Sequence, residues 1–232
     1  LHLILFFVFS ERLSAQTIQY TGDTIKILDK GNLISGEGQI QIKINDNIII
    51  NSEEFKYFAD TKIYKISNKI NFIDTLNSLE ISAGQILYFE KTGLFEISKK
   101  VNLKDNIKEI TISGEKLFYS EKKGVFENFE NVILNDKINK INAKSSQILY
   151  SKFEDKIFSN KNTNIIYNSN YDISLSDFEY IITDNKISSK GLVTIEDNIS
   201  NYFELDGFKL NGKFNQFLGK KLKFIDVEKN EY

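Results

Sequence analysis

Apolar residues recur along the chain with a period of 30–31 residues. The clearest column is rich in aromatics and holds Ile27, Tyr57, Tyr88, Tyr119, Tyr150, Tyr180 and Leu210. A second column lies two residues earlier and holds Ile25, Phe55, Ile86, Leu117, Ile148, Phe178 and Phe208. A third lies seven residues later and holds Ile34, Tyr64, Phe95, Phe126, Ile157, Ile187 and Phe217. Apolar residues make up 41% of the chain, so 21 apolar matches in 21 positions have a chance probability of about one in 10⁸.

Each repeat predicts a β-hairpin. Apolar pairs such as Val101 and Leu103 are spaced two residues apart, the period of a strand, and β-branched and aromatic residues dominate them. Turn formers follow the aromatic column, for example Thr92-Gly93 and Asn211-Gly212. The pattern therefore predicts two strands joined by a tight turn in every repeat.

The two-residue alternation breaks once inside most strands, at small or polar residues. These breaks fall at Asn51-Ser52, Ser67-Asn68, Ser82-Ala83-Gly84, Ser98-Lys99, Ser113-Gly114 and Ser145-Ser146. Such a break indicates a bulge, and a strand bent there can serve two packed sheets. We therefore expect an all-β, repeat-built, two-sheet β-jelly-roll of about seven hairpin units, with open sheet edges at its ends. The predicted partner edges carry Ile18, Ile25, Ile27, Phe208, Leu210 and Phe217.

Composition excludes several classes of chemistry. The chain has no Cys, Pro, Met or Trp, and its only His and only Arg are His2 and Arg12. This leaves no thiolate or imidazole nucleophile, no His- or Cys-based metal site and no disulfide in the body of the chain. A net charge of −2 gives no global field toward nucleic acid. We expect no enzymatic activity, no cofactor, no metal and no nucleic-acid partner.

The N-terminus predicts export from the cytoplasm. The apolar run Leu1 to Phe9 is followed by a polar stretch and by Ser14 and Ala15, small residues that suit a signal-peptidase site. We expect a signal peptide over residues 1–15, truncated at its start, with an uncleaved membrane anchor as the alternative. Residues 16–232 would then form the jelly-roll domain, with continuation into a C-terminal barrel as an option that the sequence leaves open.

The repeats resemble a known family. The segments ISAGQILYFEKT, ISGEKLFYSEKK and AKSSQILYSKFE alternate with SKKVNLKD and FENVILND. This resembles the small-residue, apolar, Tyr segment and the Gly-Asn-Val-like segment of the OstA-like lipopolysaccharide-transport proteins, which include LptA and the N-terminal domain of LptD. The number of units and the run-on C-terminus favour the LptD N-terminal domain. The resemblance covers Ile18 to about Ile225.

The resemblance implies a periplasmic protein, associated with the outer membrane, that carries the acyl chains of lipopolysaccharide in its interior. Its implied partners are lipopolysaccharide, other Lpt jelly-roll proteins joined edge to edge, and an outer-membrane barrel or lipoprotein in the LptD case. Acyl chains in water cost ~0.8 kcal/mol per CH₂, so such a carrier needs an apolar path. The expected lipid-lining residues are Phe55, Tyr57, Tyr64, Ile86, Tyr88, Phe95, Leu103, Leu117, Tyr119, Phe126, Ile148, Tyr150, Phe178 and Tyr180.

Three questions stay open from the sequence. The tyrosine column is interpreted either as a core ladder of stacked rings or as a row of rim hydroxyls that meet sugar or phosphate. The main alternative to a hairpin roll is a secreted parallel β-solenoid with a structural or adhesive role, and an uncoupled lipid-binding module is a further option. Leu87, Phe118 and Leu149 point opposite to the tyrosines, which predicts either an outer patch or a reversed inside face.

Overall fold

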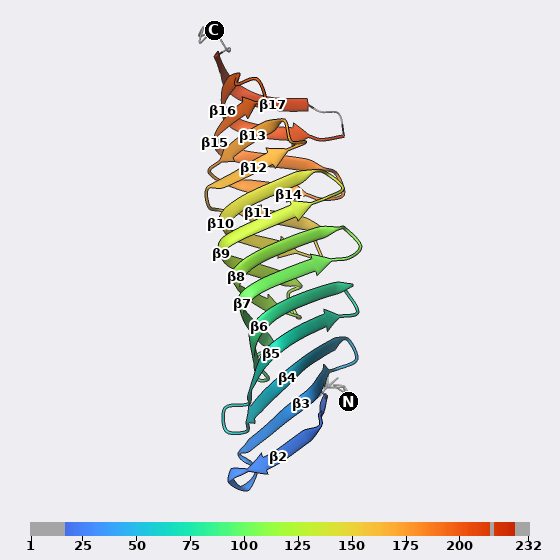
Figure 1. Cartoon of the computed structure of the whole chain (residues 1–232). Coiled ribbons are helices and arrows are strands. Elements are labelled where there is room, and N and C mark those ends of the chain that lie inside the picture. The colour runs from blue at the N-terminus through green and yellow to red at the C-terminus, as the bar shows by residue number, and fades with distance from the viewer. Residues whose placement is uncertain (1–16, 214–215, 226–232) are drawn as a thin grey trace, which may run out of the picture.

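The chain forms an elongated stack of antiparallel strands (Figure 1). The computed structural model describes residues 17–213 and 216–225. The expected signal peptide lies outside these residues. Within them, seventeen strands form one sheet, and a short 3₁₀ turn at Asp29–Gly31 is the one helical element. No helix in this described part is long and apolar enough to cross a membrane.

The strands of the long stack are mostly ten to twelve residues in length. Their bounds are β1 Ile18–Thr21, β2 Thr24–Leu28, β3 Leu33–Ile44, β4 Ile48–Phe58, β5 Ile63–Asp74, β6 Leu79–Phe89, β7 Leu94–Asp105, β8 Ile110–Ser120, β9 Val125–Asp136, β10 Ile141–Ser151, β11 Lys156–Ser159, β12 Thr163–Tyr167, β13 Tyr171–Leu175, β14 Phe178–Ile181, β15 Lys186–Asp197, β16 Tyr202–Asn211 and β17 Gln216–Ile225. In three places, two short strands take the place of one long strand and pair with the same long neighbour. β1 and β2 both pair with β3, β11 and β12 both pair with β10, and β13 and β14 both pair with β15.

Every strand pairing among the described residues is antiparallel. Tyr88 and Phe95 are register partners across the β6–β7 hairpin, as the repeat pattern predicted. A parallel solenoid would instead stack Tyr88 on Tyr119 in neighbouring coils. The structure therefore confirms the all-β hairpin roll and contradicts the solenoid fold.

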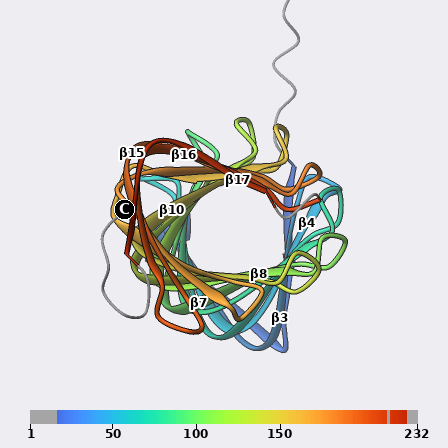
Figure 2. The same cartoon turned by 90° about the horizontal axis from the view of Figure 1, so that it is seen from above.

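The bulges lie where the alternation breaks. Register shifts occur between Ser82 and Gln85 on β6 and between Ser98 and Val101 on β7, with equivalent shifts in the other long strands. Each long strand bends there, so its two halves belong to different layers. Layer 1 contains segments such as 79–83 and 101–105, and layer 2 contains segments such as 85–89 and 94–98. Seen along the long axis, the strands enclose one interior (Figure 2). The two expected sheets are thus two layers of a single folded sheet.

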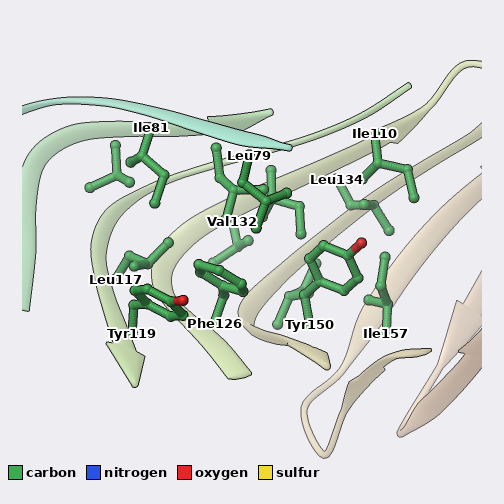
Figure 3. Packing of buried hydrophobic residues seen from close by; sticks show 14 of the residues in the cluster. Leu79, Ile81, Ile110, Leu117, Tyr119, Phe126, Val132, Leu134, Tyr150 and Ile157 are labelled. Carbon is green, nitrogen blue, oxygen red and sulfur yellow. The ribbon is translucent and has the colours of Figure 1, made fainter. Parts of the chain in front are cut away.

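Stacked rings run through layer 2 of the interior. Tyr88 and Phe95 have centroids 4.4 Å apart, and Tyr119 and Phe126 are 4.2 Å apart with planes only 4° apart. Phe95 contacts Tyr119 at 5.7 Å and so joins one hairpin to the next. Figure 3 shows Tyr119, Phe126 and Tyr150 among the aliphatic residues of both layers. The tyrosine column is therefore a core ladder, the first of the two interpretations.

Leu87, Phe118 and Leu149 face outward and are half-buried. Acidic residues alternate with them across the strands, because Phe118 is the register partner of both Glu96 and Glu127. Lys116 forms an ion pair with Glu96 at 2.7 Å, and its Nζ lies 4.7 Å from the centroid of the Phe118 ring. The outer face is thus an amphipathic surface, and the inside face is not reversed in the middle repeats.

Candidate functional site: the apolar interior and its edges

The expected lipid-lining residues share the inner face of the roll. Of this set, only Tyr57 is not buried; it is partly buried and packed against the core. The others are 5% exposed or less, and most of them have no accessible surface at all. They form part of one continuous cluster that extends from Ile40 on β3 to Leu210 on β16. An apolar interior therefore runs through nearly the whole stack.

This interior is filled by its own side chains. Tyr88, Phe95 and Tyr119 all have 0% exposure, so no water-sized space touches them. In Figure 3, aliphatic side chains of layer 1 such as Leu79 face rings of layer 2 such as Phe126 and Tyr150. The resemblance implies an apolar path for acyl chains, and in the structure this path is closed and filled by side chains. A guest molecule would have to displace these side chains or separate the two layers.

A row of buried tyrosine–aspartate hydrogen bonds joins the two layers, and sequence reasoning missed it. Tyr119 Oη donates to Asp74 Oδ2 at 2.8 Å. In the following repeats Tyr150 donates to Asp105 and Tyr180 donates to Asp136. The turns after β5, β7 and β9 face the turns after β8, β10 and β14. The three hydrogen bonds lie along the line between these two rows of turns, and we name this line the seam. The signal in the sequence was an aspartate column, Asp74, Asp105 and Asp136, with the same 31-residue period.

Each seam aspartate also organises its own turn. Asp74 Oδ1 accepts from the backbone N–H of Asn77, and Asp136 Oδ1 accepts in the same way from Asn139. All three carboxylates are 1% exposed, so these hydrogen bonds replace the solvation that burial removes. The seam is therefore a built element of the fold in which tyrosine hydroxyls face carboxylates, not a solvent-exposed rim of free hydroxyls.

The seam shifts the pKa values of its members. Burial, reinforced by the neighbouring aspartates, raises the pKa of Tyr119, Tyr150 and Tyr180 well above the usual tyrosine value. Burial also acts to raise the pKa of Asp105, but hydrogen bonds from Lys152 and Tyr150 outweigh it and hold that pKa below its ordinary range. Lys152 donates directly to Asp105 Oδ2, so this rung of the seam carries an ion pair.

Both ends of the stack have unpaired strand edges within the described residues. β1 and β2 pair only with β3, and β17 pairs only with β16. Ile25 and Ile27 lie on β2 with 39% and 70% of their surface exposed. Phe217 lies on β17, whereas Phe208 and Leu210 are buried on β16, which pairs on both sides. Of the three residues expected at the C-terminal edge, Phe217 thus lies on the outermost described strand, β17, and Phe208 and Leu210 lie on the strand next to it.

The remaining polar features give little further chemistry. No group of three or more acidic or His side chains that could hold a metal ion occurs in the described residues. A surface groove of about 780 Å³ near the C-terminal end is lined by Phe158 and Leu218 together with residues of both charges, including Asp206 and Lys209. Its mixed lining selects no ligand class.

The comparisons with known proteins add little. No family model and no curated protein matches the chain. Among solved structures, the chain matches the crystal structure of LptH, the LptA homologous periplasmic component of the conserved lipopolysaccharide transport device from Pseudomonas aeruginosa. The match has 12% identity and a TM-score of 0.24, and it covers 59% of this chain and 77% of that one. A likeness this weak carries no argument, so the functional inference rests on the geometry above.

Proposed function

We propose that this protein transports lipopolysaccharide through the periplasm, as its resemblance to the OstA-like family implies. In this proposal the acyl chains occupy the interior between the two layers, and like domains join at the unpaired edges. The single observation that carries the proposal is the continuous apolar interior, which runs through nearly the whole stack, from Ile40 on β3 to Leu210 on β16.

The dimensions of the interior suit acyl chains. Twelve strands from β3 to β16 lie side by side in each layer, and at ~4.8 Å per strand they give a path of roughly 50 Å. Bringing a chain into this path recovers ~0.8 kcal/mol for each CH₂ removed from water. The displaced aromatic and aliphatic side chains can pack against the guest, so the closed core and the loaded state use the same residues.

The edges suit assembly with similar domains. β2 presents Ile25, Ile27 and Leu28 to solvent, and β17 presents Leu218 and Leu222 at the other end. Unpaired N–H and C=O groups on such strands favour addition of another strand. A second jelly-roll at either end would extend both the sheet and its apolar interior. The proposal places the protein in the periplasm, in contact with outer-membrane components of the same system.

Site-specific photo-crosslinking tests the cargo. A photoreactive residue at Phe95, which is fully buried on the inner face, should capture lipopolysaccharide from cells. The same residue at Glu96, the next position on β7 and on the outer face, should not. Equal capture at both positions would indicate non-specific adhesion. Capture at neither position in folded protein would leave a structural or adhesive repeat with a dry core.

A further inference from the structure

One amide side chain lies inside the apolar interior. Asn128 is on β9, has 0% exposure and sits between its register partners Leu117 and Ile148 on the neighbouring strands. One and two repeats earlier the same inward position holds Ile97 and Ile66, which are also fully buried. The fold therefore accepts an aliphatic residue at this position, and packing gives no reason for an amide there.

The Asn128 side chain has no hydrogen-bond partner among the described residues, on either its nitrogen or its oxygen. Two buried serines nearby do have partners. Ser159 Oγ, one repeat later, donates to the carbonyl of Gln147 at 2.7 Å, and Ser145 Oγ lies 3.3 Å from Ser159 Oγ. A buried polar group without a partner loses its solvation and gains nothing in return. Asn128 thus destabilises the closed roll.

A trapped water is a poor partner for this amide. An ordered internal water needs two to four polar neighbours, and the register partners Leu117 and Ile148 offer none from their side chains. A guest in the interior could supply what is missing. The amide of Asn128 presents a donor and an acceptor together, so its complement is a group that both accepts and donates.

We propose that Asn128 binds a polar group of the guest's acyl chain that both donates and accepts, namely an amide or a hydroxyl near its head end. This inference rests on the proposed function, because it requires an acyl chain in the interior. Leu117, Ile148 and Ile97 hold the hydrocarbon, and Asn128 fixes the position of the chain along the roll. An ester can accept from Asn128 but cannot donate to it, so the site distinguishes an amide-linked chain from an ester-linked one.

Two near-isosteric probes test the proposal: the N-methyl amide and the methyl ester of one saturated fatty acid. Binding of each is measured by displacement of a fluorescent fatty acid from the purified protein. The amide should bind the wild type about tenfold more tightly than the ester, the effect of one additional hydrogen bond in a desolvated site. In Asn128→Ile this preference should vanish, because isoleucine can form no hydrogen bond with either probe. Ile66→Val, a purely apolar change at the equivalent position two repeats earlier, should keep the preference.

The stability of the unloaded protein gives a second measurement. Asn128→Ile should unfold at a higher urea concentration than the wild type, because it removes the unpaired amide. An amide preference that survives in Asn128→Ile, or that is absent from the wild type while both probes bind, would overturn the role of Asn128 and leave the proposed function standing. Binding of neither probe to any variant would instead count against the acyl-binding interior itself.

Discussion

Tyr119 on β8 donates a hydrogen bond of 2.8 Å to Asp74 on β5, and the two residues are 45 positions apart in the chain. This distance is about one and a half repeats, so the bond does not join neighbouring strands within a layer. It joins the end of a strand in layer 2 to the end of a strand in layer 1, three strands away. The strands are tilted along the stack (Figure 1), and the hydrogen bond shows that these two ends lie together.

The first prediction concerns this bond. Tyr119→Phe removes the hydroxyl and leaves Asp74 with one donor fewer in a buried position, while the ring keeps its stacking on Phe126. We expect the free energy of unfolding to fall by about 1–3 kcal/mol, the cost of leaving a buried acceptor unsatisfied. Urea denaturation followed by circular dichroism measures the change.

Tyr57→Phe is the matched control. Tyr57 belongs to the same column and its hydroxyl bonds Glu90 at 3.2 Å, but the residue is partly exposed. Water can replace that bond, so the loss should stay below about 0.5 kcal/mol. Equal losses in the two variants would show that the seam bonds add nothing beyond an ordinary surface contact.

Much of the fold follows from the sequence, because the pattern within each repeat predicts the local structure of that repeat. The three apolar columns mark the inner face, and the breaks at Ser82 and Ser98 mark the bulges where the strands change layer. The seam does not follow in the same way. The pairing of Asp74 with Tyr119 depends on the tilt that sets layer 1 against layer 2, and a periodic pattern is unchanged when one layer slides by a repeat. The single amide at Asn128 was also hidden, since a lone departure from a column gives no sign of its burial.

The second prediction is an alkaline loss of stability. Burial and the nearby aspartates raise the pKa of Tyr119, Tyr150 and Tyr180 in the folded protein, whereas the unfolded residues ionise near pH 10. A raised folded pKa gives stability that is complete below pH ~10 and is lost as the pH rises above it. Each of these tyrosines should lower the unfolding free energy by up to ~1.4 kcal/mol per pH unit in that range.

Urea titrations between neutral and strongly alkaline pH measure this loss, with tyrosinate absorbance followed in parallel. The buried tyrosines should ionise together with unfolding and not before it. Tyr119→Phe should show a shallower decline, because one of the shifted groups is gone. Ionisation of the whole tyrosine set in the folded protein near pH 10 would contradict the buried, aspartate-facing positions.

The third prediction is an acid dependence that originates at Asp105. Hydrogen bonds from Lys152 and Tyr150 hold the pKa of Asp105 below its usual value. A lowered folded pKa gives stability that is present above the unfolded value of about 3.9 and is lost as the pH falls through the folded pKa. Asp105→Asn should therefore be less stable than the wild type at neutral pH, and the difference should shrink below pH ~4.

The control for Asp105→Asn is Asp60→Asn, a change of the same chemistry in an exposed turn. It should leave the unfolding midpoint nearly unchanged at every pH. A deficit in Asp105→Asn that stays constant down to pH ~2 would mean that the carboxylate's charge does not stabilise the fold. In that case the lost stability of Asp105→Asn would have to come from the turn contacts of Asp105, although Asn can partly reproduce these contacts.

The last prediction addresses the exposed edge. Ile27 lies on β2, which within the described part of the chain pairs on one side only, and 70% of its surface is exposed. Leu76 is exposed to the same 70% but lies in the turn after β5, three strands in from β2. Lysine on an edge strand opposes strand addition, because a strand that pairs with this edge places its side chains against the lysine charge. Ile27→Lys should therefore weaken end-to-end association, and Leu76→Lys should not.

Sedimentation velocity over a range of protein concentrations distinguishes these variants. We expect the wild type and Leu76→Lys to associate with the same concentration dependence and Ile27→Lys to need at least tenfold more protein, the effect of a loss of about 1.4 kcal/mol. Equal weakening by both lysines would mean that general surface hydrophobicity drives association. The two side chains have the same exposure and receive the same charge, but only Ile27 lies on an edge strand. A difference in association would therefore assign the contact to the β2 edge.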